Sequence, residues 1–173
     1  HGNFKNTNLY FPNQYLSHHS INNSLPEIND EFIQWNIEDE FGIGTYEANE
    51  HSDKIIVAVI DTGIIEHPDL VDRILPGYDF ISSPEIANDG DGRDFDPTDE
   101  GDFIEFGDEC YLGTSSPSSW HGTHVAGIIA ANDDLTGIKG VSKNSLILPI
   151  RALGKCGGLM SDIMESILWA AGI

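Results

Sequence analysis

The chain has 173 residues, enough for one domain with a hydrophobic core. Its 29 acidic residues and 8 basic residues give a formal net charge of −21 at pH 7. This balance argues against binding to nucleic acid or to an anionic membrane surface, because both need Lys and Arg. No apolar run of about 18 residues predicts a membrane span. The acids either form a solvated surface or cluster around cations, and composition leaves both open.

The first fifty residues are the least regular part of the chain. Residues 1–24 are rich in Asn, Ser and His without a sustained period, which predicts an extension lying on a domain rather than in its core. His1 opens a polar segment and not a signal peptide, so we expect that any export signal has already been removed. Residues 25–50 mix apolar residues with acids and predict one or two short helical turns.

Apolar runs predict the strands of a parallel sheet. Residues 54–60, KIIVAVI, are β-branched without alternation, which is typical of a strand covered on both faces. A second short strand is expected near residues 74–80. Residues 82–119 then form a polar loop far longer than a structural connection needs. Residues 146–152, LILPIRA, predict another strand, in which Pro149 favours an edge position or a break in pairing.

Helices are predicted between and after these strands. The first follows His121 and carries small residues that allow close packing: Gly122, Ala126, Gly127, Ala130 and Ala131. The second is expected to be capped by Ser161, with Asp162 in its first turn. Its inward face is predicted to hold Ile163, Ile167, Leu168 and Ala171. The order predicts an α/β fold with a doubly wound, mainly parallel sheet and helices on both faces, incomplete at residue 173 because further strands are needed.

Asp61 and His121 are the candidate acid–base pair. Asp61 ends the first predicted strand, where α/β sheets place their sites, and His121 begins the first predicted helix. Each is ordinary in isolation, since an aspartate can cap a turn and a histidine can lie on the surface. Together they suggest a carboxylate that orients an imidazole, whose other nitrogen acts as a general base. His121 and His124 could instead bind zinc, but no third ligand follows at helical spacing.

Cys110 and Cys156 are too few for a disulfide-rich scaffold or a zinc site made of cysteines alone. Both lie in glycine-containing loops, which favours a disulfide over two buried thiols. If they pair, the bridge contributes about 4 kcal/mol on the chain-entropy model.

Several segments together carry a family resemblance. VAVIDTGI, HPDL, SSWHGTHVAGIIAA and ILPIRALGKCGG occur in this order between about residue 28 and the end, and they resemble the subtilisin-like serine proteases. The resemblance implies that Asp61 orients the ring and that His121 is the general base and acid. The family's nucleophilic serine and the oxyanion-hole asparagine lie further downstream in its members, and no serine of this chain stands in the family's motif. We therefore assign no nucleophile within the 173 residues.

The resemblance also implies a substrate-binding edge between Leu153 and Met160. In the family this segment pairs with the substrate backbone, a form of β-augmentation. Gly157 and Gly158 would allow close approach of the substrate chain, with Leu153, Leu159 and Met160 near its side chains. A plain glycine turn is the alternative. Pairing of Cys110 with Cys156 would connect the acidic loop to this edge.

Two calcium sites are expected. The loop NDGDGRDFDPTDEGD is similar to a calcium-binding loop of secreted bacterial family members with a GKCGG segment, and it implicates Asp89, Asp91, Asp94 and Asp96 with the Arg93 carbonyl, and Asp102 as a further candidate. A solvated acidic loop is the alternative. The family's stronger site implies the side chains of Asp30, Asp69 and Asp134 with the carbonyls of Asn132, Thr136 and Ile138. This second site places the start of the mature domain near residue 25.

The expected protein is thus a secreted, calcium-stabilised serine endopeptidase that acts on protein or peptide substrates. Residues 25–173 would be the N-terminal part of its catalytic domain, and residues 1–24 an extension or propeptide remnant. This chain alone should be inactive and would need the C-terminal part of the domain, either as a second chain of a nicked enzyme or as the remainder of a truncated one. The alternative is a non-catalytic calcium-binding module or a pseudoprotease that has lost the serine.

Overall fold

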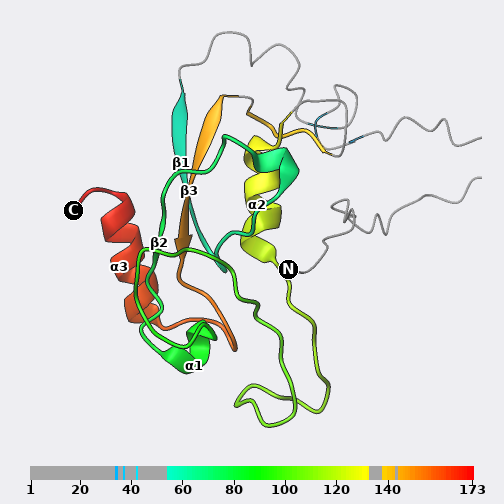
Figure 1. Ribbon diagram of the computed structural model, residues 1–173, viewed down its shortest axis with the longest axis vertical. Helices are drawn as coiled ribbons and strands as arrows, with labels where there is room; N and C mark the ends of the chain where they lie inside the picture. Colours follow the sequence, from blue (N-terminus) through cyan, green and yellow to red (C-terminus); the bar gives the residue numbers. More distant parts are fainter. Residues whose placement is uncertain (1–33, 35–36, 38–41, 43–53, 133–137, 143) are drawn as a thin grey trace, which may run out of the picture.

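A small parallel sheet forms the centre of the computed structural model, which describes residues 54–132, 138–142 and 144–173 together with Gln34, Ile37 and Gly42. In these ranges the strands are β1 (Ile55–Asp61), β2 (Tyr78–Asp79) and β3 (Ser145–Arg151), in the order β1-β3-β2. The helices are η1 (Pro68–Leu70), α1 (Pro84–Ala87), α2 (His121–Ala130) and α3 (Met160–Ala170). Helices α2 and α3 lie on opposite sides of the sheet (Figure 1). The predicted α/β class, with a parallel sheet and helices on both faces, is confirmed.

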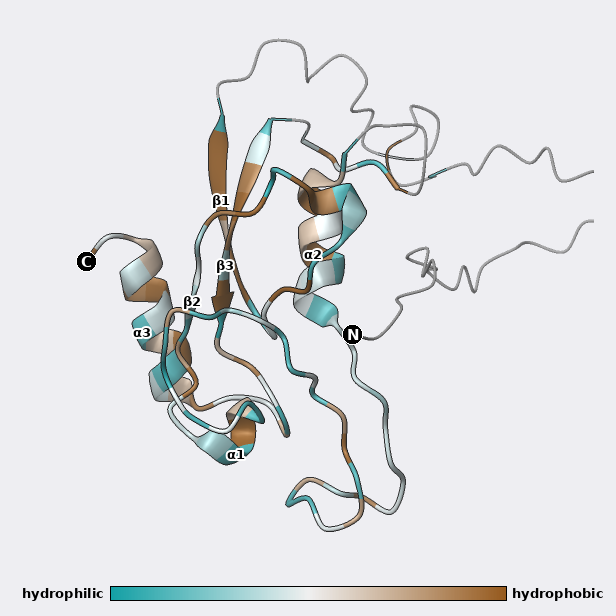
Figure 2. Cartoon of the chain, viewed as in Figure 1, coloured by the Kyte–Doolittle hydropathy of each residue, from teal (hydrophilic) through white to brown (hydrophobic). Residues whose placement is uncertain are grey.

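Close packing of α2 on β1 and β3 forms the core. Val59, Leu70 and Ile147 pack against Ala126 and Ala130 of the helix, and all five are buried. The two long strands are predominantly apolar (Figure 2). Small residues let the helix axis approach the sheet, so that the expected packing role of the small residues after His121 is confirmed.

Pro149 lies in the central strand rather than at an edge, so the first alternative predicted for it is wrong. The second, a break in pairing, is confirmed on the β2 side. Ile147 exchanges hydrogen bonds with the chain around Ile74, and regular pairing with β2 resumes at Ile150 and Arg151, so that among described residues Leu148 and Pro149 have no paired residue on this side. Pro149 is two residues from both Ile147 and Arg151, so its backbone faces the β2 side as theirs does. A proline has no N–H to donate there.

Helix α3 differs from its prediction in two ways. It begins at Met160 after an extended Leu159, so Ser161 lies inside the first turn and does not cap the helix. Its buried residues are Asp162 and Ser166, and the apolar residues predicted to face inward are mostly exposed: Ile167 is 51% and Leu168 46% accessible. On the buried side of the helix, the Asp162 carboxylate accepts hydrogen bonds from both the N–H and the hydroxyl of Ser82, which accounts for the burial of this acid.

The segment between β2 and α2 is polar and long, as predicted, but it returns to the sheet. Ile64 N–H donates to the Pro97 carbonyl, and Asp99 N–H donates to the Ile64 carbonyl, at 3.0 Å each. The segment therefore contacts the turn that follows β1. In the described part of the chain, no helix is long and apolar enough to cross a membrane.

Some predictions fall outside the described residues. These are the extension at residues 1–24, most of the helical turns at 25–50, and the calcium ligands Asp30, Asp134 and Thr136. Gln34 is described, and its side-chain amide donates to the Lys139 carbonyl and accepts from the Lys139 N–H. Ile37 is 5% exposed. Gln34 thus contacts the body of the domain, and Ile37 is buried.

Candidate active site

Asp61 and His121 form the pair that the sequence predicted. Asp61 is the last residue of β1 and His121 the first of α2. The His121 Nδ1 atom lies 2.8 Å from each carboxylate oxygen of Asp61. The Asp61 side chain is 11% exposed and that of His121 is 62% exposed, so the opposite edge of the imidazole is open to a reacting group. Asp61 Oδ1 also accepts the Thr62 N–H at 2.7 Å, which fixes the carboxylate.

Glycines allow the end of β1 and the start of α2 to meet. A Cβ atom on Gly122 would stand 2.2 Å from the Gly63 carbonyl oxygen and 3.2 Å from the Asp61 Cβ. Gly63 itself has φ of +108°, a conformation that favours glycine. The DTG and HG sequences therefore reflect a steric requirement for bringing Asp61 and His121 within hydrogen-bonding distance.

A buried acid that sequence reasoning missed, Asp99, supports the same turn. Its Oδ2 accepts the Thr62 hydroxyl at 2.5 Å, and its Oδ1 accepts the Gly101 N–H at 2.8 Å. The Thr62 hydroxyl oxygen in turn accepts the N–H of Gly122 at 3.0 Å. Burial raises the pKa of Asp99 above its ordinary value, against the lowering effect of these hydrogen bonds. In the sequence, Asp99 was one of many acids in the loop, and nothing in its spacing distinguished it.

A second acid of the segment between β2 and α2, Asp102, is linked to the His121 backbone through Ser119. Asp102 accepts both the N–H of Ser119, at 2.6 Å, and its hydroxyl, at 2.8 Å. The Ser119 hydroxyl oxygen then accepts the His121 N–H at 3.3 Å. The first residue of α2 is thus held through Ser119, which precedes the helix.

His124 is three residues after His121 but contributes differently. Burial lowers its pKa below the ordinary value of 6.5, and the charges of His121 and His67 lower it further. His67 lies before η1, where its Nδ1 accepts the Asp69 N–H at 3.2 Å. In the described ranges, no group of three or more His, Cys, Asp or Glu side chains is arranged to hold a metal ion.

The predicted substrate edge follows β3 directly beside Asp61. The N–H groups of Ala152 and Leu153 both donate to the Asp61 carbonyl, at 2.9 and 3.1 Å. Gly154 and Gly157 then close a tight turn through two mutual backbone hydrogen bonds. Gly157 and Gly158 are exposed beyond it, and so are Leu159 and Met160, at 42% and 70%. A Cβ on Gly158 would stand 2.3 Å from the Ala152 carbonyl oxygen.

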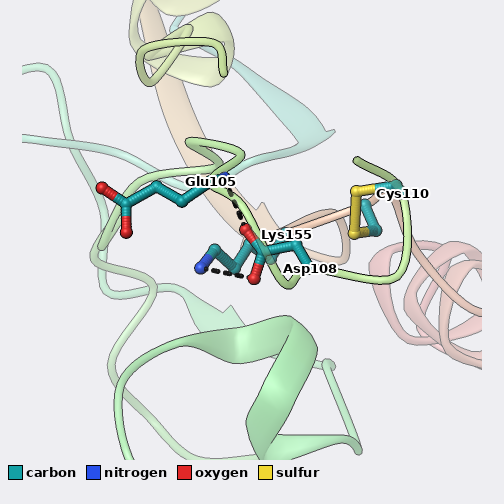
Figure 3. Close-up of a disulfide and its surroundings, with 5 residues drawn as sticks. Glu105, Asp108, Cys110 and Lys155 are labelled. Carbon is teal, nitrogen blue, oxygen red and sulfur yellow. Dashed lines mark hydrogen bonds and ion pairs between the residues drawn. A yellow bond between two sulfur atoms is a disulfide. The ribbon is translucent and has the colours of Figure 1, made fainter. Parts of the chain in front are cut away.

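The predicted disulfide between Cys110 and Cys156 is present, with 5.5 Å between the Cα atoms. It joins the acidic segment to the turn after β3. Beside it, Lys155 Nζ lies 3.1 Å from Asp108 Oδ1, and Asp108 Oδ2 accepts the Glu105 N–H (Figure 3). The expected connection between the long loop and the edge at residues 153–160 is confirmed.

The predicted calcium loop engages arginines. Asp89 Oδ2 lies 2.5 Å from Nη1 of the buried Arg151, which also donates to Asp79 at 2.6 Å. Arg93 directs its guanidinium to Asp162 on α3, 2.6 Å away. The remaining predicted carboxylates, Asp91, Asp94 and Asp96, belong to the same loop, where Asp94 Oδ1 accepts the Asp96 N–H at 2.7 Å. Among described residues these acids do not converge into a metal cage.

Three predicted ligands of the second site are described. The Asn132 N–H donates to the carbonyl of Asp69 at 2.7 Å, so these two residues are adjacent. Asp69 is 8% and Ile138 4% exposed. The Asn132 side-chain oxygen accepts from Arg73 Nε at 2.8 Å. The predicted ligand atom is the backbone carbonyl of Asn132, which takes no part in that contact.

Comparison with known proteins agrees with this geometry. The Subtilase family model matches residues 52–172. The chain is 52% identical over 119 residues to an extracellular protease of Xanthomonas campestris pv. campestris, covering 68% of the chain and 20% of that protein. It is 44% identical over 152 residues to an extracellular basic protease of Dichelobacter nodosus, covering 80% of this chain and 24% of that protein.

A solved structure of a protease from Pseudoalteromonas arctica PAMC 21717 superimposes with a TM-score of 0.65 at 52% identity, covering 68% of this chain and 35% of that one. The chain spans between a fifth and a quarter of the length of the two curated relatives. The family model covers well over half of the chain, and the matched region contains the Asp61–His121 pair. This chain therefore belongs to the subtilase family.

Proposed function

We propose that the chain is the N-terminal part of the catalytic domain of a secreted subtilisin-like serine endopeptidase. The observation that carries the proposal is the contact between His121 Nδ1 and both carboxylate oxygens of Asp61. The relatives named as extracellular proteases support secretion and a protein substrate. The contacts of Gln34 with Lys139 and the burial of Ile37 support a domain that starts before them, near residue 25, with residues 1–24 as an extension.

In the proposed mechanism, Asp61 holds His121 and leaves its Nε2 atom for catalysis. Nε2 takes the proton of a serine hydroxyl as that oxygen attacks the scissile carbonyl carbon, and later returns the proton to the leaving amine. Asp61 stabilises the imidazolium that forms in between. The serine and the oxyanion-hole asparagine come from the part of the domain that follows residue 173.

The segment from Leu153 to Met160 is the proposed substrate-binding edge. The N–H groups at the start of this edge donate to the Asp61 carbonyl. A peptide paired with the edge would therefore pass beside His121. Gly157 and Gly158 offer exposed backbone for that pairing, and Leu153, Leu159 and Met160 offer apolar contacts to substrate side chains. The Cys110–Cys156 bridge holds this edge against the long acidic segment.

Exposed apolar surface supports a missing complement of the domain. On β1, Ile55 and Ile56 are 56% and 59% exposed, although such residues normally lie in a core. On α3, Met164, Ile167 and Leu168 are also exposed. The C-terminal part of the protease domain, in the same chain or as a second chain, would cover these surfaces and pair with the edge of β1 that no described strand covers.

Calcium is proposed as a structural ion. Asp69, Asn132 and Ile138 fit a site of hard oxygen donors, because a backbone hydrogen bond already places Asp69 beside Asn132. In the acidic loop the donor chemistry fits calcium as well, since carboxylates accept several partners each. There, however, Asp89 also pairs with Arg151. The proposed ligands are the side chains of Asp89, Asp91, Asp94 and Asp96 and the Arg93 carbonyl.

A serine-directed fluorophosphonate tests the function on the full-length protein that contains this sequence. We expect it to label a serine outside residues 1–173, and we expect a His121→Ala variant to lose labelling and peptide hydrolysis. The isolated 173-residue chain should not be labelled. Labelling of the isolated chain would contradict the missing nucleophile. A full-length protein that folds and binds calcium but neither labels nor hydrolyses peptides would instead be a pseudoprotease.

A further inference from the structure

The first turn of α2 is capped by tertiary contacts instead of by its own N-cap residue. Trp120 occupies the N-cap position in a left-handed conformation, with φ of 51°, and makes no side-chain capping bond. The first N–H groups of a helix have no partner within the helix. Here, the N–H of His121 donates to Ser119 Oγ and that of Gly122 donates to Thr62 Oγ1. Thr62 is therefore the cap that links α2 to the end of β1.

Thr62 can serve as this cap only if its own proton has an acceptor. A threonine hydroxyl donates one hydrogen bond, and its oxygen accepts others. Gly122 donates to the Thr62 oxygen, and the Thr62 proton goes to Asp99 Oδ2 at 2.5 Å. Asp99 and Thr62 are 4% and 5% exposed, so water has little access to replace either partner. The carboxylate, which can only accept, thus sets the donor-to-acceptor direction of the two hydrogen bonds that join Gly122, Thr62 and Asp99.

The Asp99 carboxylate satisfies both of its donors, because each of its two oxygens accepts. Asp99 receives the Thr62 hydroxyl on one oxygen and the Gly101 N–H on the other. An amide at this position would point an NH₂ group at one of the two donors, and one hydrogen bond would be lost. The position of the His121 ring depends on whether these hydrogen bonds are kept, because its side chain is 62% exposed and little packing holds the ring in place.

We propose that Asp99, acting through Thr62, is a positioning residue that holds the first turn of α2 so that His121 meets Asp61. This inference rests on the proposed protease function. Asp99 lies at the returning end of the long acidic segment, whose backbone is paired with Ile64. Through Asp99 and Thr62 the segment therefore holds the first turn of α2. Its disulfide connects it in addition to the substrate edge.

The test uses the full-length protease with Asp99→Asn, Thr62→Val and Thr62→Ser variants. We expect Asp99→Asn and Thr62→Val to lower kcat by about 10- to 100-fold, the effect of a small misplacement of a catalytic group, with KM little changed. Thr62→Ser keeps the hydroxyl and should retain kcat. The double variant Asp99→Asn/Thr62→Val should lose no more than the worse single variant, because both break one link. Glu100→Gln removes the neighbouring exposed charge and should match the wild type.

An NMR readout separates this inference from the proposed function. Amide exchange of Gly122 should be faster in Asp99→Asn and Thr62→Val than in Thr62→Ser, and the proton between His121 Nδ1 and Asp61 should lose its downfield signal. These two measurements stand even if the wild type hydrolyses nothing, a result that would remove the protease function alone. An active wild type with unchanged kcat and unchanged Gly122 exchange in Thr62→Val would overturn the positioning role, and so would a loss in Thr62→Ser equal to that in Thr62→Val.

Discussion

Gly122 passes so close to Gly63 that a Cβ atom added to Gly122 would stand 2.2 Å from the Gly63 carbonyl oxygen. Gly122 follows His121, and Gly63 follows Asp61 by two residues. The close approach of the two backbones is therefore what brings His121 Nδ1 to 2.8 Å from the Asp61 carboxylate. The geometry of the acid–base pair depends on the absence of two side chains as much as on the pair itself.

Substitution Gly122→Ala should destabilise the protein by about 1–3 kcal/mol, as expected for overpacking against rigid backbone, and should reduce hydrolysis by separating His121 from Asp61. Gly127→Ala is the matched control in the same helix. A Cβ at Gly127 would meet only Ile138 Cδ1 at 3.4 Å, and alanine is the better helix former. Thermal unfolding of the two full-length variants checks the contrast. Equal melting temperatures would contradict the steric argument.

Substitution Asp61→Asn should lower kcat by about 10⁴-fold with a nearly unchanged KM, because an amide can present its NH₂ group to His121 and favour the wrong tautomer. The Asp61 carboxylate faces His121 Nδ1 and the Thr62 N–H, so the fold should survive the change. Steady-state hydrolysis of a peptide substrate, with circular dichroism for the fold, measures both. A residual kcat within tenfold of the wild type would argue against the proposed pair.

Removal of the disulfide by Cys110→Ser/Cys156→Ser should cost up to about 4 kcal/mol, because the bridge closes a loop with a sequence separation of 46. Each single substitution should cost as much as the double one. Lys155→Met removes the contacts of the neighbouring ammonium group with Asp108 and with the Phe103 ring and should cost less. Urea unfolding of all four variants tests this ranking. The bridge is not a stability element if reduction leaves the unfolding midpoint unchanged.

His124 should make stability depend on pH. Its pKa in the folded chain is below the ordinary 6.5 because burial, followed by the charges of His121 and His67, disfavours the imidazolium. As pH falls below 6.5, the unfolded chain takes up a proton that the folded chain does not, so this contribution to stability is lost on acidification. Wild type should therefore lose more unfolding free energy between pH 8 and pH 5 than His124→Gln. Parallel pH profiles in urea unfolding would contradict the assignment.

Chelation should lower the melting temperature of the full-length protein if calcium binds as proposed. A site held at 100 times its dissociation constant contributes about 2.7 kcal/mol. Asp69→Asn should remove the chelator effect at the site that includes Asn132, and Asp91→Asn the effect at the acidic loop. Calorimetry with and without excess chelator assigns each contribution. A chelator that shifts neither the variants nor the wild type would contradict calcium binding at both groups.

Much of the site could be predicted from local sequence. The apolar run ending at Asp61 forms β1, and the small residues after His121 form a closely packed α2, because both properties depend on residue types that are adjacent along the chain. The motifs containing these residues also indicated the family. The pairing of Cys110 with Cys156 followed from there being two cysteines in glycine-containing loops.

Tertiary structure alone decided which acids and which helix faces are buried. Asp99 and Asp162 look like other acids in a chain of net charge −21, yet both are buried, because donors distant in sequence, Thr62 and Ser82, meet them. On α3, the buried positions are held by Asp162 and Ser166, and the apolar residues are mostly exposed in the described chain, against the prediction from periodicity. Hydrogen-bond partners more than thirty residues apart leave no periodic signal in a sequence, since their pairing depends on how the chain returns to the sheet.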